Sequence, residues 1–206
     1  MQSLKLMLIR HSLTEGNLQR RYLGTTDEPL CQAGFAMAQQ ASEKLPLTPQ
    51  KVYCSPLKRC IETSDIMFSD IERMIIPQLR ECSFGIFEGK THLELANDPD
   101  YIKWVASEGG FTPPGGESGA ESQARCAAAY DTIVENMSIH SLKSAAAVTH
   151  GGVIMRIMSQ LFGGGIYAWQ PENCGGFLLE FKGTDIKYQR ITVSSNGIAD
   201  DIAKIL

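Results

Sequence analysis

The sequence predicts an α/β protein, a three-layer sandwich in which helices flank a mainly parallel central sheet. Two observations support this fold class: short apolar runs typical of buried strands alternate with segments of helical periodicity, and repeated strand–helix units favour parallel pairing. The chain has 206 residues, of which 43% are hydrophobic and 20% are charged, enough for one full core. We therefore expect a single domain over residues 1–206, with a lid-like insertion at about residues 90–120.

The first half of the chain alternates predicted strands with predicted helices. Apolar runs that stop at polar residues predict short buried strands, whereas apolar residues three or four positions apart predict helices. Prolines and a serine cap indicate where the helices begin or end. The expected elements are a strand at Leu4–Ile9, a helix at Gly34–Leu45, a strand at Lys51–Cys54, a helix at about Pro56–Phe68 with Ser55 as its N-cap, and a strand at Met74–Pro77.

The second half continues the pattern after a segment rich in glycine and proline. Tyr101–Gly119 surrounds Trp104 with such residues, which indicates an insertion lying over another part of the fold, a candidate lid, rather than a core element. No repeat or second-domain boundary interrupts the rest. The expected elements are a helix at Glu121–Met137, a strand at Ala145–Thr149, a helix at Gly151–Phe162, and strands at Gly175–Phe181 and Ile186–Val193 joined by a turn at Lys182-Gly183.

Composition and charge limit which binding partners and which cellular location we expect. A net charge of -4 gives no electrostatic reason to expect nucleic acid or an anionic membrane as a partner. The six cysteines show neither C-x-x-C pairs nor the spacing of a zinc site, so we expect free thiols. We also expect no bound metal and no cofactor. The sequence shows no signal-peptide pattern and no apolar run of membrane-spanning length. We expect a cytoplasmic protein and leave open whether it forms a homodimer.

Two of the four histidines directly follow predicted strands. His11 and His150 should meet at the carboxyl edge of the sheet, where ligands bind in open α/β folds. Arg10 adjoins His11, and Arg59 falls in the first turn of a helix, where its guanidinium could hold phosphate oxygens bidentately. Phosphoryl transfer needs such donors and an in-line nucleophile. His11 becomes the candidate nucleophile if its second ring nitrogen donates to a backbone carbonyl.

The same chemistry needs an acid, because an alkoxide is a poor leaving group. Glu81 and Glu88 lie between the third strand and the candidate lid, and Glu15 is a more remote candidate. Each of the three can equally be a solvated loop carboxylate. The residues alone leave this choice open.

The segment Arg10–Asn17 closely resembles the R-H-G-x-T-x-x-N signature of the histidine phosphatase superfamily, which has a phosphoglycerate mutase-like fold. The resemblance extends across most of the chain. It implies that His11 is phosphorylated, that Arg10, Arg59 and His150 form the phosphate pocket, and that Glu81 donates the proton. The further matching segments are Gly24–Leu30, Val52–Arg59, Leu79–Glu81, Phe84–Gly85, Glu88–Gly89, Pro113–Ser118 and Val148–Gly152.

Within these motifs, Asn17 matches a position that commonly touches phosphate, and Thr14 and Gly151 are expected at the substrate as well. Two residues depart from the family pattern. Ser12 stands where the family usually has glycine, and serine is costly there if the position needs a positive φ or a close backbone approach. Cys31 stands where threonine or serine is common, so the helix that follows has a weaker N-cap.

The resemblance favours hydrolysis over phosphoryl transfer to a second metabolite. Phe84–Gly89 and Pro114–Ser118 look more like the phosphatase branch, especially bacterial α-ribazole phosphatases and broad-specificity phosphatases. We expect a metal-independent phosphomonoesterase that forms a phosphohistidine on a small phosphate ester, with α-ribazole 5'-phosphate as a candidate. The alternative is phosphoglycerate mutase-type transfer, and a non-catalytic binding module is disfavoured because every key residue is present. Tyr22, Trp104 and Phe111 contact substrate or simply pack under the lid.

Overall fold

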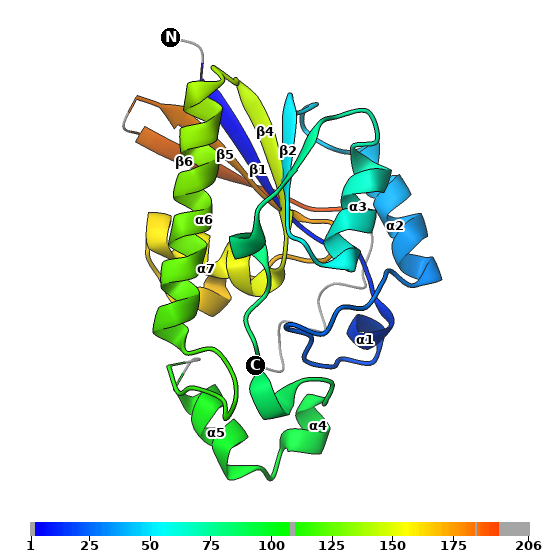
Figure 1. The fold of residues 1–206 in the computed structure, drawn as a ribbon, viewed down its shortest axis with the longest axis vertical. Helices are drawn as coiled ribbons and strands as arrows, with labels where there is room; N and C mark the ends of the chain where they lie inside the picture. The colour runs from blue at the N-terminus through cyan, green and yellow to red at the C-terminus, as the bar shows by residue number, and fades with distance from the viewer. Residues whose placement is uncertain (1–2, 108–109, 184, 194–206) are drawn as a thin grey trace.

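The computed structural model describes residues 3–107, 110–183 and 185–193, and in them six strands form one sheet between helices (Figure 1). The strands are β1 (Leu4–Arg10), β2 (Lys51–Cys54), β3 (Arg73–Ile75), β4 (Ser144–Thr149), β5 (Gly176–Lys182) and β6 (Asp185–Ile191). The helices are α1 (Glu15–Leu18), α2 (Gln32–Ser42), α3 (Lys58–Met67), α4 (His92–Leu95), α5 (Pro99–Ala106), α6 (Gly119–Ile139) and α7 (Gly151–Phe162). Short 3₁₀ helices are η1 (Pro77–Leu79), η2 (Gly85–Phe87) and η3 (Ile166–Trp169).

The sheet has the strand order β3-β2-β4-β1-β5-β6. Parallel pairing joins β3 to β2, β2 to β4 and β4 to β1, whereas β5 is antiparallel to both β1 and β6. The predicted α/β class with a mainly parallel sheet is confirmed. The parallel part brings the carboxyl ends of β1, β2 and β4 to one edge.

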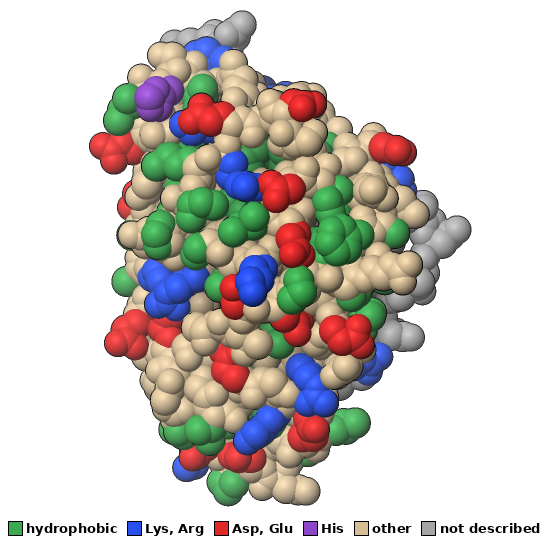
Figure 2. Space-filling view, turned by 45° about the vertical axis from the view of Figure 1, so that its right-hand side comes forward, with side chains coloured by type: hydrophobic (Ala, Val, Ile, Leu, Met, Phe, Trp, Pro, Cys, Tyr) green, Lys and Arg blue, Asp and Glu red, His purple; other side chains and the backbone are tan. Residues whose placement is uncertain are grey.

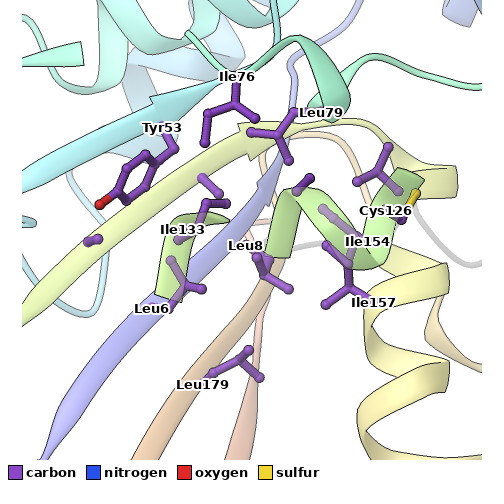
Figure 3. Close-up of a cluster of buried hydrophobic side chains, with 14 of the residues drawn as sticks. Leu6, Leu8, Tyr53, Ile76, Leu79, Cys126, Ile133, Ile154, Ile157 and Leu179 are labelled. Atoms are coloured by element: carbon purple, nitrogen blue, oxygen red, sulfur yellow. The ribbon is translucent and has the colours of Figure 1, made fainter. Parts of the chain in front are cut away.

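Alternate residues of β1 face two different helical layers. Leu6 and Leu8 belong to a buried cluster with side chains of α6 and α7, such as Ile133 and Ile154 (Figure 3). Met7 and Ile9 belong to a second cluster, which includes side chains of α2 and α3. Because both faces of the strand are covered, it reads as a continuous apolar run rather than an alternating one. The predicted three-layer arrangement is therefore confirmed.

The helix boundaries differ from the prediction for local reasons. α2 begins two residues before the expected Gly34 and ends at Ser42; Cys31 is its N-cap and makes no side-chain capping bond. α3 begins at Lys58 with Leu57 as its N-cap, so Ser55 does not cap it. The third strand stops at Ile75, because Pro77 begins η1 instead of ending the strand.

The segment expected to be a lid outside the core contains regular structure of its own. The side chain of Asp98 caps α5, because it accepts the backbone N–H groups of Asp100 and Tyr101 in the first turn of the helix. Tyr101 in that helix is only 2% exposed and shares a third buried cluster with Phe87 and Leu95. The expectation that this segment contributes nothing to a core is wrong, since glycine and proline content did not reveal the apolar face of α5.

On the face shown in Figure 2, acidic and basic side chains are interspersed, and the described residues form no large patch of one charge there. None of the described helices is long and apolar enough to cross a membrane. The prediction that nucleic acid is not a partner remains a prediction.

Candidate active site

Three parallel strands deliver their following residues to one place. Arg10 at the end of β1 is in register with Thr149 at the end of β4, so the next residues, His11 and His150, are neighbours. Their ring centroids are 5.2 Å apart. Both histidines are almost completely buried, as is Arg59 from the first turn of α3. The structure thus brings together the groups expected to meet at this edge.

The His11 ring is held in one tautomer. Its Nδ1–H donates to the carbonyl oxygen of Ser12 at 2.7 Å, which leaves Nε2 without a proton when the ring is neutral. Its backbone N–H donates to Thr149 at 2.8 Å, which ties the residue to β4. Burial, followed by the charges of Arg59 and Arg10, holds the pKa of His11 well below its usual value. The ring is therefore neutral near pH 7.

Arg10 directs an unused donor into the same region. Its Nη1 donates to the carbonyl of Pro171 at 2.9 Å, whereas its buried Nε has no hydrogen-bond partner among the described residues. Gly151 lies beside this guanidinium. Leaving a buried charged donor unpaired is costly, so an anion bound here would complete the site.

Arg59 is used differently from the expected phosphate fork. Its Nη1 donates to Thr26 at 2.7 Å and its Nη2 to Gly24 at 2.8 Å, both on backbone carbonyls. Its Nε donates to Nδ1 of His150 at 3.3 Å. Most of the guanidinium thus holds the loop at Leu23–Thr26, a contact between distant segments that the sequence spacing did not indicate.

His150 is fixed on both sides of its ring. Because Nδ1 accepts from Arg59, the neutral ring carries its proton on Nε2, which donates to Oγ of Ser55 at 2.8 Å. The same Ser55 hydroxyl, which we expected to cap α3, also accepts the N–H of Leu57 at 3.4 Å. Burial, followed by the charge of Arg59, lowers the pKa of His150 well below its usual value.

Of the three candidate acids, Glu81 lies beside the strand-end histidines. It is 6% exposed, and each carboxylate oxygen accepts one backbone N–H, from Cys82 and from Gly152, both at 2.9 Å. A Cβ at position 152 would lie 2.5 Å from Oε1 of Glu81, so only glycine admits the carboxylate here. Glu15 is exposed in the first turn of α1.

Glu88 has a different setting. Its half-buried carboxylate accepts the backbone N–H groups of Gly24, Thr25, Thr26 and Phe84, and also the Thr26 hydroxyl at 2.7 Å. Burial opposes its charge, but these hydrogen bonds outweigh it and lower the pKa of Glu88. Glu88 therefore binds the N–H groups of the Leu23–Thr26 loop, whose carbonyl groups are bound by Arg59.

The serine at the usual glycine position is accommodated without strain. Ser12 does not have a positive φ. Its N–H donates to Oγ1 of Thr63 at 2.9 Å, and its hydroxyl donates to the carbonyl of Gly34 at 2.7 Å. The possible backbone cost raised from the sequence does not arise, because the extra side chain fills a hydrogen-bonding position against α2.

Thr14 and Asn17 form a capping box at the start of α1. The Thr14 hydroxyl accepts from the N–H of Asn17 at 3.2 Å, and the Thr14 N–H donates to Oδ1 of Asn17 at 3.3 Å. Asn17 also receives a bond from Asn173 at 3.4 Å. Asn173 belongs to the segment Pro171–Cys174, which sequence reasoning missed because it lies in a loop with neither periodicity nor motif.

The aromatic residues suggested as substrate contacts pack mainly on one another. The Tyr22 and Trp104 rings meet edge to face at 5.5 Å, and the hydroxyls of Tyr22 and Tyr101 are 2.7 Å apart. Lys103 lies 5.6 Å over the ring of Phe111.

Among the described residues, no group of three or more His, Cys, Asp or Glu side chains is arranged to hold a metal ion.

At the carboxyl edge of the parallel sheet, where ligands bind in open α/β folds, a buried neutral histidine thus lies near a cationic donor that has no partner among the described residues. The profile of the histidine phosphatase superfamily, branch 1, matches residues 6–194. The chain belongs to this superfamily, and it is a phosphatase.

Individual relatives agree with this assignment. An adenosylcobalamin/alpha-ribazole phosphatase of Salmonella typhimurium is 27% identical over 163 residues, covering 77% of this chain and 79% of its own. The structure of a phosphoserine phosphatase from Entamoeba histolytica superposes with a TM-score of 0.76 at 26% identity, covering 91% of this chain and 96% of its own. A phosphoglycerate mutase from Bacillus anthracis shares the fold, with a TM-score of 0.74 at 21% identity and 92% coverage of each chain.

Proposed function

We propose that this phosphatase hydrolyses a small phosphomonoester through a phosphohistidine formed on His11. The observation that carries the proposal is the neutral His11 ring, whose Nδ1–H is bound to Ser12 while Nε2 is free to attack. The Nε of Arg10, which has no partner in the part of the chain that the structure describes, adds a donor for the transferring phosphoryl group. These two features supply the nucleophile and the charge complement that phosphoryl transfer needs.

In the proposed first step, Nε2 of His11 forms a bond to phosphorus as the ester P–O bond breaks. The leaving oxygen takes a proton from Glu81, whose carboxyl group is held at the start of α7 by the N–H of Gly152. In the second step, water attacks the phosphohistidine and gives its proton to Glu81, which releases inorganic phosphate and frees His11. In this proposal Arg10 donates to the phosphoryl group, with Asn17, Thr14 and Gly151 at its edge. Arg59 adds positive charge and His150 lines the pocket, since their hydrogen bonds are largely made within the protein.

For the substrate, the proposal favours α-ribazole 5'-phosphate. The support is that the Salmonella typhimurium relative is an adenosylcobalamin/alpha-ribazole phosphatase, together with the likeness of Phe84–Gly89 to that branch. Phosphoserine is a second candidate, because the Entamoeba histolytica neighbour is a phosphoserine phosphatase. We expect hydrolysis to need no metal, and therefore full activity in EDTA.

The test is trapping of the intermediate. Brief incubation with a ³²P-labelled phosphomonoester, followed by rapid quenching in alkali, should leave acid-labile label on the wild-type chain and none on His11→Ala. His140→Ala is the matched control, because His140 ends α6 outside the site, and it should label normally. Label that persists on His11→Ala would remove His11 as the nucleophile.

A substrate panel separates hydrolysis from transfer. α-Ribazole 5'-phosphate, phosphoserine, 3-phosphoglycerate and sugar phosphates are each assayed for free phosphate and for phosphoryl exchange. The proposal expects free phosphate as the main product, with the highest kcat/KM on α-ribazole 5'-phosphate. Exchange that exceeds phosphate release would replace the proposal with mutase activity.

A further inference from the structure

The loop before β5 contacts the site residues of β1 at several points. The carbonyl of Pro171 accepts from Nη1 of Arg10 at 2.9 Å. The N–H of Cys174 donates to the carbonyl of Arg10 at 3.0 Å, from a backbone with a φ of 60°. A positive φ is unfavourable for cysteine, so the surrounding contacts must hold this turn in place. Asn173, immediately before the turn, is directed at the residues that follow β1.

The side-chain amide of Asn173 reaches three oxygens there. Its Nδ2 lies 2.9 Å from the carbonyl oxygen of His11, 3.3 Å from that of Ser12 and 3.4 Å from Oδ1 of Asn17. An amide nitrogen carries two hydrogens, so it can serve these acceptors only by sharing. It therefore ties two consecutive peptide carbonyls to one group.

One of these carbonyls sets the chemistry of His11. The Ser12 oxygen that accepts from Asn173 is the oxygen that accepts Nδ1–H of His11 at 2.7 Å. The ring nitrogen that keeps the proton is decided by the hydrogen bond available to it. If this carbonyl turned away, the proton could move to Nε2, and the attacking lone pair would be lost.

We propose that Asn173 is a positioning residue that keeps the proton of His11 on Nδ1, and so keeps Nε2 free to attack phosphorus. The inference rests on the proposed function for its catalytic consequence, but the position of the proton can be measured without turnover. Asn173 also orients Asn17: because Oδ1 of Asn17 accepts from Thr14 and Asn173, its NH₂ group is left as the end that can meet an anion.

The experiment compares Asn173→Ala and Asn173→Asp with the wild type. Asp has the shape of Asn but no N–H donors when ionised, so it separates donation from space filling. ¹⁵N NMR of the histidine rings, assigned to residue 11 with His11→Gln, should show Nδ1–H in the wild type and a growing Nε2–H fraction in both variants. On p-nitrophenyl phosphate, kcat should fall by about 10- to 100-fold, with a smaller change in KM.

The control is Asn136→Ala, which removes another side-chain amide, the acceptor of the Tyr53 hydroxyl at 2.8 Å, in the last turn of α6. It should leave both kcat and the His11 tautomer unchanged. If Asn173→Ala does not fold, as judged by its thermal unfolding, Asn173→Asp decides the matter.

An unchanged His11 tautomer in a folded Asn173 variant overturns the positioning role, whether or not kcat falls. A wild-type chain that hydrolyses no phosphomonoester would instead overturn the proposed function. The ring spectra would still report on Asn173 in that case.

Discussion

The carboxyl ends of β1 and β4 and the loop at Leu23–Thr26 border the same site, but they are held in different ways. At the strand ends, paired backbones fix the side chains: His11 and His150 follow residues that are in register in the sheet. The loop has no such ladder. Arg59 binds its carbonyl groups and Glu88 binds its N–H groups.

The difference explains why the strand ends present neutral histidines, whereas the loop is held by a carboxylate and a guanidinium. Sheet pairing brings the two histidines into the interior, where burial, followed by the charge of Arg59, lowers their pKa values and keeps them neutral. The loop depends on charges instead, because a carboxylate and a guanidinium each bind several backbone groups. Substitutions at the strand ends should therefore alter chemistry, and substitutions in the loop supports should alter positioning.

Among the substitutions that test this contrast, Glu81→Gln should cause the largest loss of activity. Glutamine cannot donate the acidic proton, so hydrolysis of an alkyl phosphate should slow by about 100- to 10,000-fold. p-Nitrophenyl phosphate, whose leaving group needs little protonation, should slow far less. Steady-state kcat on both substrates gives the ratio. Equal losses on the two would assign the acid to another group.

As the pH falls, the free energy of unfolding should decrease first through the two strand-end histidines and only at lower pH through Glu88. The pKa values of His11 and His150 lie below the unfolded value near 6.5, so the unfolded chain binds more protons as pH falls below 6.5. The stability they contribute is complete well above pH 6.5 and declines as the pH falls through 6.5, with a limiting slope of roughly 1.4 kcal/mol per pH unit for each histidine. The lowered pKa of Glu88 has its own effect only near and below pH 4.5.

Urea unfolding of the wild type at pH 7.5, 6.5 and 5.5, compared with a His11→Gln variant, measures this slope. The variant should lose less stability between pH 6.5 and 5.5 than the wild type does. Parallel curves for the two chains would show that His11 is not the group being protonated.

A smaller, positional effect is expected from Glu88→Gln. The amide end of glutamine would face backbone N–H groups, so the Leu23–Thr26 loop and the Arg59 contacts should loosen. We expect kcat/KM to fall about 10-fold, equally for alkyl and p-nitrophenyl phosphates. Glu94→Gln is the control, because Glu94 also accepts backbone N–H, from Thr91 at 2.7 Å, but lies exposed on α4. A loss that depends on the leaving group would make Glu88 an acid after all.

The same contrast explains which parts of the structure could be predicted from the sequence. All six strands were predicted, most of them within two residues of their ends, because each is a short apolar run bounded by polar residues. The strand-end cluster followed from those strands, since residues after parallel neighbours must meet. The ends of α2 and α3 were less accurate, because a serine–proline pair does not fix where a helix begins: α3 starts at Lys58, and the Ser55 hydroxyl bonds to His150 and to the N–H of Leu57.

Contacts between distant loops could not be predicted. Nothing near Glu88 in the chain indicates that its carboxylate binds N–H groups more than sixty residues away. Arg59 was read as a phosphate fork for the same reason, because helix position indicates a positive end but not the carbonyls opposite it. Asn173 carries no motif, and only the folded position of its loop reveals its contacts with His11 and Ser12.

The smallest effect is expected at the departure from the family pattern, in Ser12→Gly. The substitution restores the usual residue but removes the buried hydroxyl that donates to Gly34 at 2.7 Å. One such bond contributes about 0.5–1.5 kcal/mol to stability, and the added backbone freedom of glycine lowers stability further. The N–H bond to Thr63 remains, so His11 should keep its orientation and kcat should change by less than about 2-fold. Urea unfolding and kcat are measured on the same preparation. A large fall in kcat with little loss of stability would mean that the serine hydroxyl, rather than the backbone, orients His11.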